Sequence, residues 1–211
     1  MVGNDQVPSG GIERGEKRED LNVFASRRGN WEVMARRGYY AKSLRNALNS
    51  GGRTAETVHG PSGDRMLVWG AAQRYRRDGD SVVVIAGDRY GMGSSRDWAA
   101  KVQRLLGVRA VLASSYERIH RSNLIGMGIM PLVVPEEYRD ALAGLRAGDV
   151  VSIAAEADRV TTGARIPVTV RRSEGADFSF EATAAIQTDV ESGLLRAGGV
   201  IPSILASTTK D

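Results

Sequence analysis

The stretch of sequence that decides the fold is residues 82–106, VVVIAGDRYGMGSSRDWAAKVQRLL. Its first five residues form a continuous apolar run rich in β-branched side chains, which is typical of a strand buried on both faces of a parallel sheet. A glycine-rich turn follows, and Asp97 to Leu106 have the pattern of a helix. Such a turn lies at the carboxyl end of its strand, the edge at which open α/β sheets bind ligands.

The segments on either side extend this pattern. An apolar run at 108–113, a helical pattern at 116–125 and a strand-like run at 130–134 follow, while 66–77 predicts an amphipathic helix upstream. The order strand, helix, strand, helix, strand implies parallel strands joined by right-handed crossovers. We therefore predict the fold class α/β, with a parallel sheet core flanked by helices over residues 65–135.

The N-terminal part of the chain has weaker signals. Residues 1–30 are polar and rich in Gly, Pro and Arg, which predicts a leading loop. Trp31–Asn49 could hold a helix or a short strand, and 50–64 contain turn signals.

After Pro135 the pattern changes again. Short apolar runs separated by turns predict a smaller mixed or antiparallel β section, and the tail from Asp189 predicts a helix with a break at Gly198-Gly199. The three runs are 150–153, 166–170 and 178–184. We expect a single domain over 1–211, in which 136–211 form the mixed β section and the C-terminal helix.

Composition bounds the chemistry. An apolar content of 42% in 211 residues supports a hydrophobic core, and no apolar run approaches the roughly 18–20 residues of a membrane span. The chain has no cysteine and two histidines, which excludes disulfides, a thiol nucleophile, a zinc site of His and Cys, and an iron–sulfur cluster ligated by its own cysteines. No signal sequence is visible, so we expect a cytoplasmic protein. The net charge of +4 favours anionic partners.

The turn Gly91–Arg96 has two interpretations. Unpaired N–H groups at the start of the following helix attract negative charge, and Arg96 can bind a carboxylate with two hydrogen bonds. Gly91 and Gly93 would let the backbone approach a ligand closely. The alternative is structural: Ser94, with Asp97 three residues later, has the spacing of a capping box that merely begins the helix.

Residues 86–134 resemble the last domain of aconitases and of the related iron-regulatory protein. The resemblance rests on a glycine-flanked GSSR followed by Asp-Trp-Ala-Ala, then on an Arg-Ile-His segment, an Asn-Leu and a Gly-x-x-Pro-Leu. Asn4-Asp5-Gln6-Val7, the Ser26–Asn30 run and Thr188–Glu191 extend it over nearly the entire chain. The resemblance implies a swivelling β/β/α domain of an aconitase-type hydro-lyase.

The resemblance also implies roles for particular residues. Ser94 matches the catalytic serine that takes a proton from carbon, Arg96 supports its ionised form, and Ser95 and Arg96 hold a substrate carboxylate. Further residues by resemblance are the substrate-binding arginines Arg14 and Arg27 and the catalytic Asp5. We predict that His120 makes a structural hydrogen bond and that His59 lies in a surface loop.

The family's [4Fe-4S] cluster acts as a Lewis acid on the departing hydroxyl. Because this chain has no cysteine, we expect a large partner subunit to hold the cluster, as in isopropylmalate isomerase, with this chain as the small subunit; the lesser alternative is a swivel domain excised from a longer chain. The expected substrate is a hydroxy tri- or dicarboxylate or an anionic analogue. Gln6 and Val102 depart from the aconitase pattern; Gln6 is closer to the isopropylmalate isomerase small subunits and leaves open the role of Asp5 and an isopropylmalate or homoaconitate type of substrate.

Two alternatives from other classes remain. The arginine pairs and a pI near 9.6 permit RNA binding like that of the iron-regulatory protein, although we expect nucleic acid not to be the partner. A non-catalytic regulatory module would predict that Ser94→Ala leaves activity intact.

Overall fold

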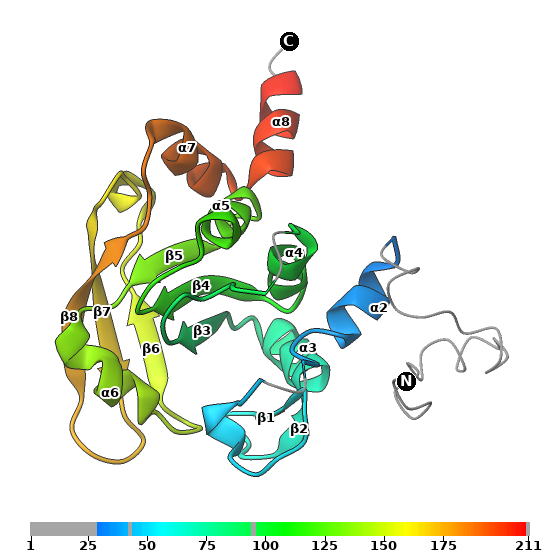
Figure 1. Cartoon of the computed structure of the whole chain (residues 1–211), viewed down its shortest axis with the longest axis vertical. Helices are drawn as coiled ribbons and strands as arrows, with labels where there is room; N and C mark the ends of the chain where they lie inside the picture. Colours follow the sequence, from blue (N-terminus) through cyan, green and yellow to red (C-terminus); the bar gives the residue numbers. More distant parts are fainter. Residues whose placement is uncertain (1–28, 42–43, 94–95, 210–211) are drawn as a thin grey trace, which may run out of the picture.

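The computed structural model describes residues 29–41, 44–93 and 96–209. Its centre is one six-stranded sheet in the order β3-β4-β5-β8-β7-β6, and a separate two-stranded hairpin, β1-β2, lies to one side (Figure 1). The sheet strands are β3 (Val82–Ala86), β4 (Val108–Ala113), β5 (Met130–Val133), β6 (Val150–Ile153), β7 (Arg165–Arg171) and β8 (Phe178–Ala184). The predicted α/β class is confirmed.

The first half of the sheet is parallel, as predicted. Strands β3, β4 and β5 are joined by helices α4 (Trp98–Leu105) and α5 (Arg118–Gly126). On β4, Ala110 and Leu112 face one core cluster while Val111 and Ala113 face the other, so this strand is buried on both faces. Strand β3 was expected to be buried in the same way, but it lies at the edge of the described sheet and its residues are only partly buried.

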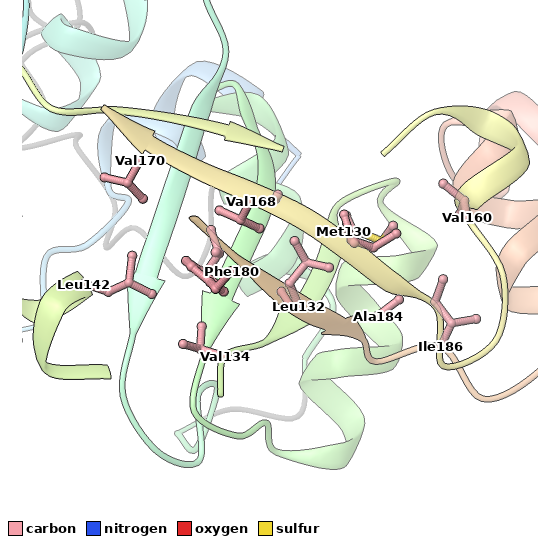
Figure 2. Close-up of a cluster of buried hydrophobic side chains, with 14 residues drawn as sticks. Met130, Leu132, Val134, Leu142, Val160, Val168, Val170, Phe180, Ala184 and Ile186 are labelled. Atoms are coloured by element: carbon pink, nitrogen blue, oxygen red, sulfur yellow. The ribbon is translucent and has the colours of Figure 1, made fainter. Parts of the chain in front are cut away.

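The second half of the sheet is antiparallel and continuous with the first. Strand β8 pairs with β5 through Leu132↔Ala184 and Val133↔Thr183, and β7 and β6 follow. The mixed β section expected after Pro135 is therefore an extension of the same sheet. Figure 2 shows the cluster of buried side chains that joins the two halves, with Leu132 of β5 beside Val168 of β7 and Phe180 of β8.

The β1-β2 hairpin and two helices form a smaller unit beside α4. It contains α2 (Trp31–Arg36), a short 3-10 helix (Ala47–Asn49), β1 (Glu56–Val58), β2 (Arg65–Leu67) and α3 (Val68–Asp78). Where a helix or a short strand was expected over 31–49, residues 31–36 form an α-helix and 47–49 a 3-10 helix, and 50–64 contain a strand besides turns. Met34, Ala35 and Ala72 pack with Val102 and Leu106 of the α4 region in a third core cluster.

The part of the chain after β5 contains several short helical segments and ends in two helices that meet at a pair of glycines. Short helical segments lie at Glu136–Tyr138, α6 (Arg139–Ala143) and Ala157–Arg159, and then α7 (Asp189–Ala197) and α8 (Val200–Thr208) end the described chain. The predicted break is confirmed, because Gly198 has φ 86° and Gly199 has φ 120°. A side chain at Gly128, which follows α5, would overlap the backbone of Gly198. Within the described residues, no helix is long and apolar enough to cross a membrane.

Candidate active-site turn

The turn after β3 lies at the carboxyl edge of the parallel strands, as predicted. Its first half continues the pairing with the segment that follows β4: Ser114 N donates to Gly87 O at 3.2 Å, Tyr90 N donates to Ser115 O at 2.9 Å, and Glu117 N donates to Tyr90 O at 2.9 Å. Glu117 also caps α5, because its carboxylate accepts from the N–H groups of Ile119 and His120. The turn therefore leaves the sheet on a fixed path up to Tyr90.

Gly91 is required by its surroundings. Its φ is 95°, which L-residues rarely adopt, and a Cβ there would overlap the side chain of His120. Gly93, in contrast, has nothing within 4 Å of the position that a Cβ would take. Close packing inside the protein thus explains Gly91, while Gly93 leaves open space above the turn.

A buried polar cluster supports the turn from below, formed by Tyr90, Gln103 and His120. The Tyr90 hydroxyl donates to Gln103 Oε1 at 3.0 Å, and Gln103 Nε2 lies 3.2 Å from His120 Nε2. Burial raises the pKa of Tyr90 to about 12 and lowers the pKa of His120. Both groups are therefore neutral near pH 7.

The buried Tyr39 hydroxyl faces that of Tyr90, and burial raises the pKa of Tyr39. It makes no hydrogen bond of good geometry with any residue in the described part of the chain. The ring of Tyr90 also contacts those of Tyr116 and His120 edge to face, with centroids 6.3 Å and 5.3 Å away. Tyr90 is thus enclosed on several sides.

Helix α4 begins immediately after the turn. Arg96 is exposed just before it, and Asp97 occupies the N-cap position without a side-chain capping bond. A capping box formed by Ser94 and Asp97 would need Asp97 at the third helical position. Asp97 instead precedes the first helical residue, Trp98, while Ser94, the other member of the box, lies outside the described residues, so its capping role stays an alternative.

Of the predicted site residues, the structure describes only Arg96. Ser94, Ser95, Asp5, Arg14 and Arg27 lie outside the described residues, so their roles stay predictions. The structural role of His120 is confirmed by its burial and its contact with Gln103.

The prediction for His59 was wrong. This residue is 4% exposed, its Nδ1 lies 2.9 Å from Ser62 Oγ, and its ring centroid lies 4.7 Å from that of Tyr75. The neighbouring Gly60-Pro61 suggested an exposed loop, but α3 covers the turn of the hairpin. The burial of His59 depends on its contact with Tyr75 of α3, which the sequence around His59 does not indicate.

The described residues do not fit a metal cluster. None of them form a group of three or more His, Cys, Asp or Glu side chains that could hold a metal ion, and the sequence has no cysteine. We therefore derive no chemical step that this chain performs through a cluster of its own.

The sequence that forms the parallel strands and the Gly-rich turn before Arg96 matches a known family. A family model described as "Aconitase C-terminal domain" matches residues 11–137. This span is more than half of the chain and includes the turn, β3 to β5 and both connecting helices. The chain belongs to the aconitase C-terminal domain family.

Curated relatives carry the name aconitate hydratase A. The protein of Thermus thermophilus is 42% identical over 201 residues, which are 95% of this chain and 22% of that protein. The Escherichia coli protein is 40% identical over 197 residues, 93% of this chain and 22% of the relative. The Bacillus subtilis protein is 38% identical over 213 residues, 99% of this chain and 23% of the relative. The chain spans about a fifth of the length of these relatives.

Among solved structures, a 3-isopropylmalate dehydratase from Methanocaldococcus jannaschii is similar, with a TM-score of 0.36 and 20% identity. The match covers 61% of this chain and 68% of that chain. A likeness of this size adds nothing to the family assignment, which rests on the sequence.

Proposed function

We propose that this chain supplies the base and the carboxylate-binding groups of an aconitase-type hydro-lyase. The observation that carries the proposal is the position of the turn 87–97, which leaves β3 at the carboxyl edge of the parallel strands and ends with Arg96 exposed before α4. A guanidinium and the N-terminus of a helix both attract negative charge, so this corner favours an anionic substrate. Family membership supplies the class of reaction.

In the proposed reaction, the Ser94 alkoxide removes a proton from one substrate carbon. The electron pair of the C–H bond forms a double bond to the neighbouring carbon, from which hydroxide leaves, so that one water is lost in total. Addition of water in the opposite sense moves the hydroxyl group. A serine hydroxyl is too weak a base at neutral pH, and we assign the stabilisation of its ionised form to Arg96 and to the N–H groups at the start of α4.

The remaining predicted site residues complete the proposal. Ser95, Arg96, Arg14 and Arg27 would hold the carboxylates of a hydroxy tri- or dicarboxylate or of an anionic analogue, and Asp5 would orient a group or relay a proton. Several arginines suit such a substrate because each guanidinium can bind a carboxylate with two hydrogen bonds.

We further propose that the [4Fe-4S] cluster lies on a large partner subunit. The absence of cysteine from the 211 residues supports this, since this chain cannot supply thiolate ligands. The named relatives are single chains about four to five times as long, so their remaining length is the counterpart of such a subunit. The complex is the proposed enzyme, and the isolated chain is half of its active site.

The test measures turnover of citrate, isopropylmalate and homocitrate by the chain alone and with cluster-bearing partners. We expect no turnover by the chain alone. With the right partner, Ser94→Ala and Arg96→Lys should each lower kcat about 100-fold or more, because a base or its electrostatic support is lost. Arg77→Lys, at the end of α3, is the control and should retain activity.

Two results would contradict the proposal. Wild-type turnover by the isolated chain would remove the need for a partner. An unchanged kcat in Ser94→Ala, in a complex that is active with the wild-type chain, would show that another group is the base.

A further inference from the structure

We infer that Gln103 is a positioning residue for the proposed catalytic turn. Its amide binds Tyr90, the residue before Gly91, and His120, the side chain on which Gly91 packs. Gln103 itself lies on α4, the helix that follows the turn. The inference rests on the proposed function, because the position of the turn affects turnover only if the turn carries the base.

The Gln103 amide is fully engaged inside the protein. The residue is 5% exposed, its Oε1 accepts from the Tyr90 hydroxyl at 3.0 Å, and its Nε2 donates to the Ala99 carbonyl at 3.4 Å and lies 3.2 Å from His120 Nε2. Since the Ala99 carbonyl can only accept, the nitrogen of the amide faces Ala99 and His120. The oxygen is then correctly placed for Tyr90.

This orientation also fixes the state of His120. With Gln103 Nε2 as the donor, His120 Nε2 accepts and the proton of the neutral ring lies on Nδ1, a buried atom without a hydrogen-bond partner among the described residues. Burial, which lowers the pKa of His120, favours the same neutral form over the raising effect of Glu117. His120 therefore supports the turn through its shape and one accepted hydrogen bond rather than through charge.

Tyr90 is held at both its backbone and its hydroxyl group. Its backbone pairs with Ser115 and Glu117 beyond the end of β4. Its ring lies against Tyr116, whose hydroxyl donates to Val111 O at 2.7 Å and accepts from Leu132 N at 3.0 Å, so this neighbour is fixed across β4 and β5. The bond to Gln103 is the connection that runs from Tyr90 to α4.

The Gln103 side chain therefore joins the two ends of the turn. One end is Tyr90, anchored to the sheet, and the other is the start of α4 at Trp98, eight residues later. The amide thus holds Tyr90 and Gly91, the described start of the turn, in place relative to α4. Without the amide, Tyr90 and Gly91 can shift relative to α4, and a displacement of about 1 Å at a reacting group can cost about 100-fold in rate.

The test compares Gln103→Met with Gln187→Met in the complex with the cluster-bearing partner. Gln187 also hydrogen-bonds an α5 side chain, because its Oε1 accepts from Arg121, which faces α7 rather than the turn. We expect Gln103→Met to lower kcat about tenfold or more with a smaller change in KM, because two of the proposed binding arginines, Arg14 and Arg27, lie outside this turn of the sequence. Gln187→Met should retain kcat.

Two additional measurements separate positioning from general destabilisation. Tyr90→Phe keeps the ring and removes the hydroxyl; it should reproduce part of the kcat loss, and the double variant should lose no more than Gln103→Met alone. In NMR spectra of the full chain alone, Gln103→Met should shift the amide resonances of Gly91 and Gly93, and Gln187→Met should not. If Gln103→Met unfolds the chain, Tyr90→Phe carries the same test.

The outcomes are distinct. Unchanged kcat in Gln103→Met and Tyr90→Phe, or unshifted Gly91 and Gly93 resonances, would overturn the positioning role. If no partner gives turnover, or if Ser94→Ala is fully active, the proposed function fails instead. Shifted glycine resonances would then show a turn held by Gln103, but the inference that this turn is catalytic would fall with the function.

Discussion

His120 and Arg121 are neighbours on α5, yet they belong to two different buried polar clusters. His120 is neutral and faces Gln103 and the turn. Arg121 is charged and faces α7, where it binds both oxygens of Glu191 at 2.7 and 2.9 Å and the Ala185 carbonyl at 2.7 Å. One cluster leads to the proposed site, and the other connects elements of the scaffold.

This difference shows that helix α5 contacts the proposed catalytic turn through one side chain and stabilises the scaffold through the next. The Arg121–Glu191 pair is nearly buried, with side chains 8% and 17% exposed, so its loss should be seen mainly in folding stability. The contact between His120 and Gly91 involves neutral groups and a backbone without a side chain, so its loss should be seen mainly in the turn. Three changes test this separation, taken from the largest expected effect to the smallest.

Removal of the Arg121 side chain should give the largest loss of folding stability. Arg121→Ala leaves the Glu191 carboxylate partly buried without its partner, which should lower the free energy of unfolding by about 3–5 kcal/mol. Urea unfolding measures this loss, with Arg118→Ala, an exposed position on the same helix, as the control that should change it by about 0.5 kcal/mol or less. Equal losses in the two variants would contradict a structural role for the pair.

A methyl group at Gly91 should have an intermediate effect. Gly91→Ala forces a Cβ into the His120 side chain at a positive φ, which should cost about 1–3 kcal/mol of stability and lower kcat of the assembled enzyme. Adding His120→Ala removes two of the three overlapping atoms, Cγ and Cδ2, and keeps Cβ, so it should recover part of the stability of Gly91→Ala. Strictly additive losses in the double variant would show that the two residues do not interact as described.

The dependence of stability on pH should show the smallest effect. The hydrogen bonds from Arg121, first among the causes, hold the pKa of Glu191 below its usual range. The folded pKa is below the unfolded value, so this contribution is present above about pH 4.3 and is lost as the pH falls through the folded value. Burial lowers the pKa of His120 as well. The contribution of the neutral His120 ring to folding stability is therefore lost in a higher pH window, as the pH falls below about 6.5.

Urea midpoints measured from neutral to acidic pH can separate these windows. Glu191→Gln should flatten the curve only in the more acidic window, and His120→Gln only in the higher one. Flattening of both windows by either variant would contradict the separation of the two clusters.

The parallel core was predictable because its signals are local. The β-branched run of β3 gave the strand's bounds, and the Gly198-Gly199 pair gave the break between α7 and α8. The pairing of β8 with β5 depends on contacts between segments about 50 residues apart, and the place of β3 at the edge of the described sheet depends on the order of all the strands; no periodicity in the sequence records either.

The candidate site was predictable in part for the same reason. The turn and Arg96 were found from a strand–glycine–helix pattern and from family resemblance. Gln103 and Tyr90 were missed, because a glutamine within a helix and a tyrosine in a turn are ordinary surface residues in a sequence. Only the fold shows that their side chains meet and that His120 lies against Gly91.

The approach of Gly128 to Gly198 has a consequence for how this domain can diverge. Two backbones 70 positions apart occupy the space that a single methyl group would need, and a Cβ at Gly199 would lie 2.7 Å from the Gly126 carbonyl oxygen. No substitution of Gly128 avoids the overlap, whatever the polarity or size of the new side chain, because every other residue has a Cβ. The loop after α5 and the junction before α8 are therefore expected to change together in evolution, because a side chain in one requires the backbone of the other to move.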